Sequence, residues 1–221
     1  SFAMDDTDNG STSKSSQHNV FIGLSAGGGT WTDVASNYNV AIGNYSMDSA
    51  LDGALYNTSV GYESLSSVTT GDQNVALGYQ ALTAGTSNSY NVVIGVEAFK
   101  TADDGENNNV AIGWGAGQLV NASGSDENVF IGTFAGKGGT GALTKSVAVG
   151  VNALKSTDST GSTGQVAIGY NALTNLTSGV NNTALGYQAG LSMTDNNSNT
   201  VIGYEAFKAA DSGENLNTVI G

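Results

Sequence analysis

The sequence predicts an all-β chain that coils into a parallel β-solenoid, in which each turn, or rung, takes about 18 residues. One short motif, typified by Asn-Val-Ala-Ile-Gly, occurs twelve times along the chain. The closing glycines of successive copies follow one another at nearly constant spacing, as in Gly61, Gly78 and Gly95. A unit this short cannot bury a core alone, so the copies must stack on one another. A constant motif with a variable spacer indicates a fixed strand joined by loops that tolerate insertion.

The repeats also show a longer period. Glu97-Ala98-Phe99-Lys100 recurs as Glu205-Ala206-Phe207-Lys208, six rungs further along the chain. We therefore expect one repeat domain over residues 19–221, made of two six-rung blocks at about 19–127 and 128–221. Residues 1–18 are predicted to be an N-terminal arm that is flexible or was in part introduced by cloning.

Alternation inside the motif predicts the strand. Val20 and Ile22, or Val110 and Ile112, share one face because side chains alternate with period two. Large branched residues favour a buried groove, so we expect this face to point into the rung. The middle residue then points outward, and its small size predicts close approach of another chain. The predicted trimer-facing residues are Ala41, Ser59, Ala76, Ala111, Ala148, Ala167 and Ala184.

The rest of each rung is expected to hold a tight turn and a second short strand. The motif glycine permits positive φ, and a second apolar pair such as Ala81-Leu82 or Ala98-Phe99 follows it. Four rungs carry Ala-Gly in place of this pair. In most of them we expect a bulky residue further on to fill the same core position: Trp31, Leu119, Leu143 and Leu191.

Composition limits the classes of partner. The chain has 6 basic against 19 acidic residues, a net charge of −13, and no Cys. Nucleic-acid binders need clustered Lys and Arg, so a nucleic-acid partner is not expected. No apolar run has the length of a membrane span, so this segment is not expected to insert directly into a membrane. The acidity suits an extracellular surface.

The motif resembles the head repeat of trimeric autotransporter adhesins, and it is also similar to repeats of phage tail fibres. Asn182-Thr183-Ala184-Leu185-Gly186-Tyr187-Gln188-Ala189 is nearly the tail-fibre form, and the resemblance covers residues 19–221. It implies a left-handed parallel β-roll that forms a homotrimer along its length. It also implies an extracellular location, on a virion tail fibre or a bacterial cell surface. The rungs here are longer and more variable than those of the autotransporter heads.

No catalytic residue and no cofactor are predicted. His18 is the only histidine, and it is expected to be an ordinary surface residue. Carboxylates gather in equivalent loops of the two blocks, at Asp103, Asp104 and Glu106 and at Asp211 and Glu214. We expect these loops to be solvated, with calcium at Asp103, Asp104 and Glu106 as a weaker alternative because oxygen-rich loops suit that ion.

The aromatic residues divide into two sets. One set follows the motif glycine and is expected to form a packing ladder at the rung corner: Tyr62, Tyr79, Trp114, Tyr170, Tyr187 and Tyr204. The other set lies outside that column and supplies the candidate receptor contacts, since aromatic residues are enriched at recognition surfaces. These candidates are Trp31, Tyr38, Tyr45, Tyr56 and Tyr90.

Three functions remain open on this sequence. The favoured one is a structural and adhesive segment of a trimeric surface fibre that presents loops to a host glycan or protein. The alternatives are a fibre-borne β-helical enzyme that degrades polysaccharide with acidic residues, and a structural spacer that binds no ligand.

Overall fold

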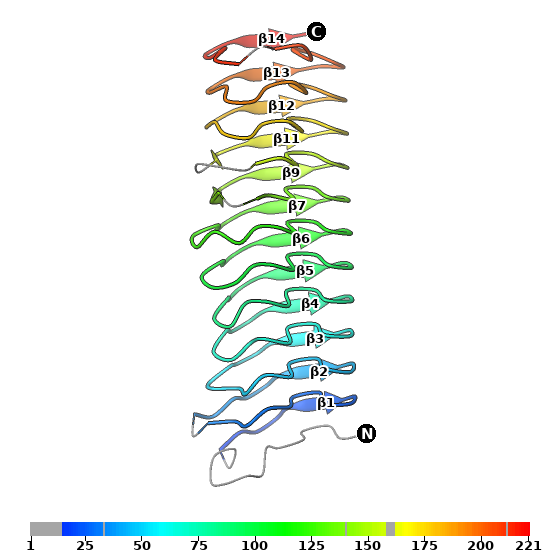
Figure 1. Cartoon of the computed structure of the whole chain (residues 1–221). Coiled ribbons are helices and arrows are strands. Elements are labelled where there is room, and N and C mark those ends of the chain that lie inside the picture. The colour runs from blue at the N-terminus through cyan, green and yellow to red at the C-terminus, as the bar shows by residue number, and fades with distance from the viewer. Residues whose placement is uncertain (1–14, 33, 140, 158–161, 211) are drawn as a thin grey trace.

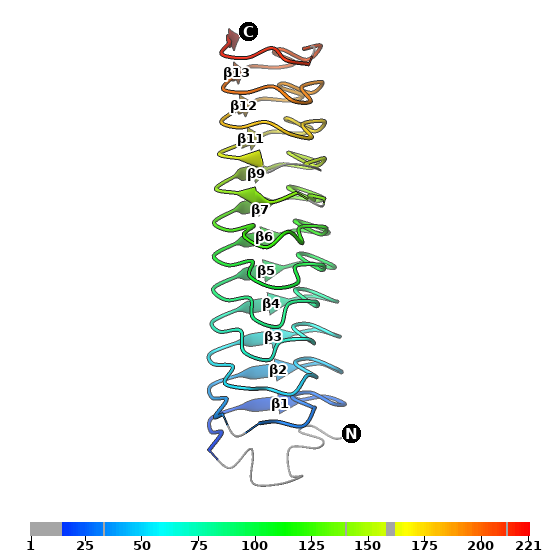
Figure 2. The same ribbon diagram turned by 60° about the vertical axis from the view of Figure 1, so that its left-hand side comes forward.

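The chain forms a parallel β-solenoid of about eleven turns in the computed structural model (Figures 1 and 2). The structure describes residues 15–32, 34–139, 141–157, 162–210 and 212–221. Twelve short strands, one from each motif, stack in chain order into a single sheet. They are β1 (Val20–Ile22), β2 (Val40–Ile42), β3 (Thr58–Val60), β4 (Val75–Leu77), β5 (Val92–Ile94), β6 (Val110–Ile112), β7 (Val129–Ile131), β9 (Val147–Val149), β11 (Val166–Ile168), β12 (Thr183–Leu185), β13 (Thr200–Ile202) and β14 (Thr218–Ile220).

The register of this sheet aligns each motif position with its equivalents. Val40 pairs with Thr58, Ala41 with Ser59 and Ile42 with Val60, and the same in-register pairing continues through the sheet. Every motif position therefore forms a column that runs the length of the solenoid. Neighbouring members of a column are about 4.8 Å apart, the spacing of hydrogen-bonded strands.

The second strand expected at the apolar pair after the motif glycine is not formed in any of the described rungs. The short strands β8 (Leu143–Thr144) and β10 (Ser162–Thr163) pair with each other in a separate sheet. These two strands lie just before the next motif, whereas the second apolar pair lies in turns, with Leu82 and Phe99 both at φ 50°. Left-handed backbone geometry at these leucine and phenylalanine positions interrupts the extended conformation that a strand requires.

The expected orientation of the strands is wrong: the Val/Ile face points outward and the middle residue points into the solenoid. Ala41, Ser59, Ala76, Ala111, Ala148, Ala167 and Ala184, the predicted trimer-facing residues, are all at most 1% exposed within the single chain. In contrast, Ile22 is 57% exposed and Leu77 is 45% exposed. The interior of such a short rung is narrow, so small side chains belong inside and large ones outside.

A few rungs place a large residue at the middle position, and they compensate for it with glycine. Phe21 and Phe130 occupy that position in β1 and β7. A Cβ on Gly27 would come within 2.6 Å of the Phe21 ring, and one on Gly136 within 2.2 Å of the Phe130 ring. The Ala-Gly rungs thus make room for an inward phenylalanine in these two cases.

The predicted fillers of the Ala-Gly rungs are partly confirmed. Trp31 and Leu143 are buried, and Trp31 packs edge-on against Phe21 with ring centroids 5.7 Å apart. Leu119 is 40% exposed, and Val120 is buried in its place. In the rung of Gly190 the buried residue is Met193, close to Leu191 along the chain.

A ladder of buried amide side chains runs beside the middle column. Oδ1 of Asn57 accepts hydrogen bonds from the backbone N and from Nδ2 of Asn74, both at 3.0 Å. Nδ2 of Asn74 also donates across the interior to the carbonyl of Asn88, at 2.6 Å. The pattern repeats from Asn39 to Asn128 and from Asn182 to Asn217, and Ser146 and Gln165 continue it between the two runs.

The motif glycines form a second column that only glycine can occupy. Gly78 has φ 143°, and a Cβ at this position would lie 2.4 Å from the carbonyl oxygen of Gly95 in the next rung. The same close approach recurs between successive motif glycines from Gly23 to Gly203. Both the backbone conformation and the space exclude a side chain.

Replacing Asn74 with Ala is expected to destabilise the solenoid by about 3 kcal/mol, because it leaves the amide of Asn91 and the carbonyl of Asn88 without their buried partners. Denaturant unfolding followed by circular dichroism measures this change. Asn175→Ala, at an exposed loop position, is the control and should cost less than about 0.5 kcal/mol. Equal effects of the two substitutions would contradict a structural role for the amide ladder.

Gly78→Ala should lower the melting temperature far more than Gly124→Ala. Both glycines have positive φ, so both substitutions strain the backbone, but an added Cβ meets no atom within 4 Å at Gly124. The difference between the two variants combines the contact with Gly95 and the more restrictive φ of 143° at Gly78, against 88° at Gly124, and should exceed about 2 kcal/mol. Similar melting temperatures would show that the rungs separate easily enough to admit a methyl group.

Candidate binding surfaces

The most extensive exposed feature is an apolar stripe on the outer face of the twelve-stranded sheet. We call it the aliphatic stripe; it consists of the first and third residues of each strand. The third residue is Ile, Leu or Val in all twelve strands, and the first is Val in eight and Thr in four. Ten of these side chains are exposed large hydrophobics: Val20, Ile22, Ile42, Val75, Leu77, Val92, Ile131, Ile168, Leu185 and Ile220.

The size of the aliphatic stripe sets it apart from scattered surface hydrophobics. Eleven intervals of about 4.8 Å give a length of roughly 50 Å, and two alternating columns give a width of about 10 Å. The resulting area, on the order of 500 Å², is at the upper end of what a monomeric protein exposes as one patch. A patch of this size is typical of an interaction surface.

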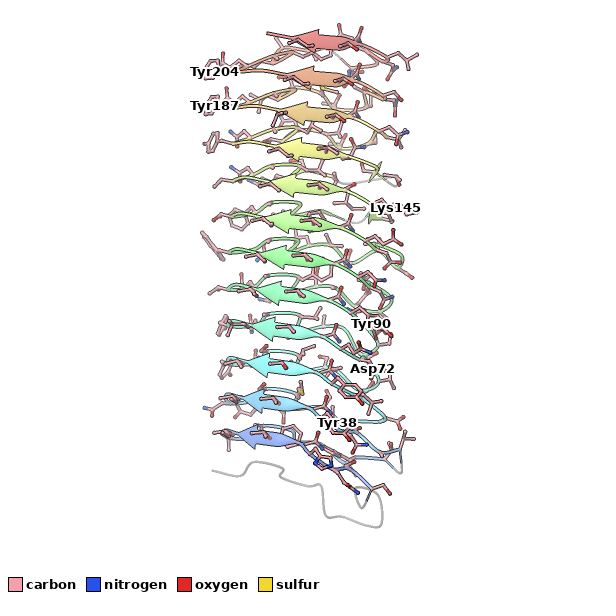
Figure 3. The ribbon with its side chains drawn as sticks, turned by 180° about the vertical axis from the view of Figure 1, so that it is seen from behind. Tyr38, Asp72, Tyr90, Lys145, Tyr187 and Tyr204 are labelled. Atoms are coloured by element: carbon pink, nitrogen blue, oxygen red, sulfur yellow. The ribbon has the colours of Figure 1, made fainter. Side chains whose placement is uncertain are left out.

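Aromatic columns border the aliphatic stripe at both ends of the strands. In Figure 3, Tyr38 and Tyr90 lie where the strands begin, and Tyr187 and Tyr204 lie beyond the point where they end. Because consecutive rungs are one strand spacing apart, rings in one column stack face to face. The rings of Tyr38 and Tyr56 are 4.9 Å apart with an interplanar angle of 1°, and Tyr187 and Tyr204 are 5.2 Å apart at 8°.

Stacking determines which parts of these aromatic side chains are exposed to a ligand. In the stack of Tyr170, Tyr187 and Tyr204, the middle ring is covered on both faces by its neighbours, so Tyr187 exposes mainly its ring edge and hydroxyl group. This arrangement agrees with the packing ladder expected after the motif glycine. His18, at the start of the other column, is exposed and stacks on Tyr38 with ring centroids 5.0 Å apart.

The candidate receptor contacts fall into different environments. Trp31 is 1% exposed, and its Nε1 donates to the carbonyls of Gly27 and Gly28, so its assignment as an exposed contact is wrong. Its large side chain is needed to fill the core position left by Gly27. Tyr38, Tyr56 and Tyr90 are 47%, 54% and 53% exposed. Tyr45 is half-buried and lines a hollow.

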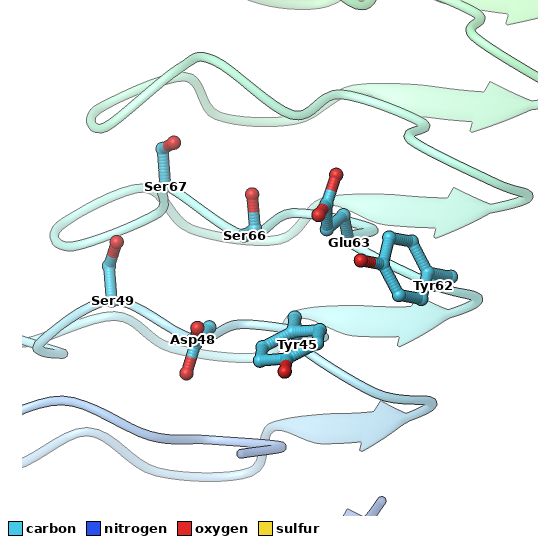
Figure 4. Close-up of a pocket in the computed structure, with 7 residues that line it drawn as sticks. All are labelled: Tyr45, Asp48, Ser49, Tyr62, Glu63, Ser66 and Ser67. Carbon is cyan, nitrogen blue, oxygen red and sulfur yellow. The ribbon is translucent and has the colours of Figure 1, made fainter. Parts of the chain in front are cut away.

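That hollow combines acidic and aromatic groups (Figure 4). It has a volume of about 380 Å³ and is lined by Tyr45, Asp48, Ser49, Tyr62, Glu63, Ser66 and Ser67. Burial, followed by the charge of Glu63, raises the pKa of Asp48. A hydrogen bond with Glu63 raises the pKa of the Tyr62 hydroxyl. Two carboxyl groups beside two tyrosines make this a hydrogen-bonding, electronegative hollow that repels anions.

The acidic loop over residues 103–106 is divided between the surface and the interior. Asp104 is exposed, and its Oδ1 accepts hydrogen bonds from the backbone N of Thr86 and Ser87 and from their hydroxyl groups. These bonds, the one from the Thr86 hydroxyl first, lower the pKa of Asp104. Among the described residues no three His, Cys, Asp or Glu side chains converge as metal ligands. Asp211, from the equivalent loop, lies outside the described residues.

Glu106 is the one carboxyl of this loop that is enclosed in the solenoid. The residue is 0% exposed, and neither carboxyl oxygen has a hydrogen-bond partner among the described residues. Its backbone N donates to Oδ1 of Asn88, and its carbonyl accepts from Nδ2 of Asn91. Burial raises the pKa of the carboxyl to about 7, and the nearby charges of Asp103 and Asp126 contribute to the shift.

No family model, curated protein or solved structure matches this chain in comparisons of its sequence and fold with known proteins. No helix in the described residues is long and apolar enough to cross a membrane. The fold and these surfaces are therefore the observations from which a function can be inferred.

The buried Glu106 carboxyl predicts that stability falls as pH rises. Its pKa is 4.5 in the unfolded chain and about 7 in the folded chain, so the folded state holds the proton more tightly. The contribution of Glu106 to stability is fully present below about pH 4.5 and decreases up to about pH 7, by about 3 kcal/mol for a shift of this size. Unfolding measured between pH 4 and 8 should show this slope in the native chain and a smaller one in Glu106→Gln. An identical slope in both proteins would contradict the assignment.

Proposed function

We propose that the chain is a structural and adhesive segment of a homotrimeric surface fibre, and that the aliphatic stripe forms the contact between its copies. The single observation that carries this proposal is the unbroken column of Ile, Leu and Val at the third strand position, of which seven side chains are exposed and the other five are partly exposed. Burying this column removes apolar surface from water, at about 25 cal/mol per Å². The proposed contact surface thus differs from the one expected from sequence, the alanine column, which was predicted to face outward and is buried inside the solenoid.

A second copy of the same chain is the occupant that fits the stripe best. The stripe is straight, regular and as long as the solenoid itself, so its partner must present apolar groups with the same spacing over the same length. Another copy meets this requirement rung by rung, because its strands repeat with the same period. Symmetric self-association is also the commonest form of oligomer in soluble proteins.

Three-fold symmetry and the fibre context follow from the resemblance to autotransporter heads and tail fibres. In this arrangement three stripes meet along a central axis, and the hollows and loops of each chain face outward. We propose an extracellular location, on a virion or a bacterial surface, with a surface glycan or protein as the partner. The acidic chain, with 19 acidic residues, is consistent with such an exposed surface.

An enzymatic role for the acidic loop receives less support from the geometry. A glycosidase needs two carboxyl groups roughly 5–9.5 Å apart in a cleft that admits the sugar. Glu106 is enclosed in the solenoid, and Asp104 is engaged by four hydrogen bonds. The loop thus offers a fixed surface carboxylate and a buried carboxyl rather than a pair that faces a substrate.

Light scattering coupled to size exclusion should give the mass of three 22.2 kDa chains for the native protein. Leu77→Glu should convert it to a folded monomer, because the stripe would then bury unpaired charges at a cost of several kcal/mol. Asn121→Glu, an equal charge change at an exposed position between β6 and β7, is the control and should leave the mass unchanged.

A monomer mass for the native chain would contradict self-association, and a dimer mass would contradict three-fold symmetry. Loss of the oligomer in Asn121→Glu as well would show that net charge, rather than the aliphatic stripe, controls assembly. Circular dichroism of each variant verifies that the solenoid remains folded.

A further inference from the structure

Two lysines on neighbouring rungs share one aromatic platform. Lys137 Nζ lies 5.1 Å from the centroid of the Phe134 ring, and Lys155 Nζ lies 5.7 Å from the same centroid. Trp114, which is 54% exposed, extends the platform, with its ring 4.8 Å from that of Phe134. Attraction between the ammonium groups and the ring face holds both lysines at this site.

The two lysines also line a hollow of about 340 Å³ on the side of the solenoid. The polar groups around it come from Ser156 and Thr177, and Leu119, which is 40% exposed, supplies an apolar wall. Gly138 and Gly139 complete the lining without side chains. Cations, hydroxyl groups and one apolar surface thus face a single space.

The repeat itself provides an internal comparison for these lysines. Lys100 and Lys208 occupy the same rung position, five residues after the motif glycine, and each pairs at 2.8 Å with a glutamate three residues before it. In the rungs of Lys137 and Lys155 that place is taken by Phe134 and Asn152. Among the described residues, neither lysine has a carboxylate within ion-pair distance.

This arrangement is unusual for a chain with six Lys, no Arg and a net charge of −13. Acidic residues are abundant, yet two of the few cations stand one rung apart without an acidic partner in the described residues. The two ammonium groups, on neighbouring rungs and over the same ring, repel each other. An anion held between them would relieve that repulsion and form charge-assisted hydrogen bonds with both.

We propose that the hollow between Lys137 and Lys155 binds the acidic group of a saccharide, a carboxylate or a sulfate ester. The ammonium groups bind the anion, the hydroxyl groups of Ser156 and Thr177 bond to the sugar hydroxyls, and Leu119 contacts an apolar part of the ring. The inference rests on the proposed adhesive function for its biological meaning and names the receptor class as an acidic glycan. The acidic hollow around Asp48 and Glu63 repels the same ligand, which confines binding to the lysine site.

The test uses the full chain on a printed array of oligosaccharides that bear uronate, sialate or sulfate groups, beside their neutral counterparts. Acidic members should bind and neutral ones should not, and binding should weaken as salt is raised from about 50 to about 500 mM. Lys137→Gln/Lys155→Gln should weaken binding of the acidic members at least ten-fold. Lys100→Gln/Lys208→Gln removes the same charge from paired lysines and should leave binding unchanged.

A second variant tests the role of the missing glutamate. Phe134→Glu recreates the arrangement seen around Lys100 and should also weaken acidic-glycan binding at least ten-fold. Competition with inorganic phosphate separates the sources of the anion: equal displacement by free phosphate and by the acidic oligosaccharide would overturn selectivity for a saccharide. Equal binding of acidic and neutral members, no binding of any member, or equal losses in the two double-lysine variants would overturn the proposal.

The mass of each variant by light scattering separates this inference from the proposed assembly. A trimer that fails to bind acidic glycans disproves the lysine site but leaves the fibre proposal standing. A monomer that binds them in a Lys137- and Lys155-dependent manner supports the site and disproves the assembly.

Discussion

The ladder of buried amide side chains is the interaction on which the rest of the solenoid depends. Most of its asparagines bond to the asparagine of the next rung and also donate across the interior to a carbonyl in the opposite loop, as Asn74 does to Asn88. The first contact sets the stacking of rungs. The bond across the interior holds the loop of each rung against its strand. Since the strands are only three residues long in the main sheet, these side-chain bonds supply order that the strand ladder alone cannot provide.

The width of the interior follows from this arrangement. Asn39 and Ala41 are two residues apart in the motif, so they lie on the same side of the strand, and both are buried. The carbonyl that each asparagine reaches is only a side chain away, which leaves room for alanine but not for isoleucine. The larger aliphatic residues therefore face outward. Their exposure is a consequence of the same geometry that makes the interior stable.

The sequence was sufficient to predict the solenoid and the length of its rung but not which face of the strand is inside. Alternation defines two faces without saying which is buried, and the usual preference of large apolar residues for a core led to the wrong choice. A signal was present in the repeats themselves. The rungs with Phe21 and Phe130 at the middle position also carry Gly27 and Gly136, which touch those rings. A large residue matched by a glycine within the same rung indicates that both face one enclosed space.

The candidate binding surfaces were only partly predictable because they depend on neighbours one rung away. The exposed tyrosines could be named from their loop positions, and Tyr38, Tyr56 and Tyr90 are indeed exposed, whereas the burial of Trp31 depends on its packing against Phe21. The lysine hollow was missed because Lys137 and Lys155 are a full rung apart in the sequence and neither forms a recognised motif. Aligning the rungs by their motif glycines would have placed them in one column and shown the missing glutamates.

The amide ladder and the glycine column hold the rungs together, whereas the residues at other rung positions vary. This difference explains how one solenoid can carry surfaces of opposite charge. The hollow around Asp48 and Glu63 and the hollow around Lys137 and Lys155 share the rung position five residues after the motif glycine, and the residue two after that glycine is Glu63 beside the first hollow and Phe134 beneath the lysines of the second. Neither position contributes to the amide ladder or the glycine column. Side chains there can change between acidic, basic and aromatic without disturbing the stacking of rungs. The charge of the surface is thus set rung by rung along the solenoid, and the backbone that carries these side chains stays the same.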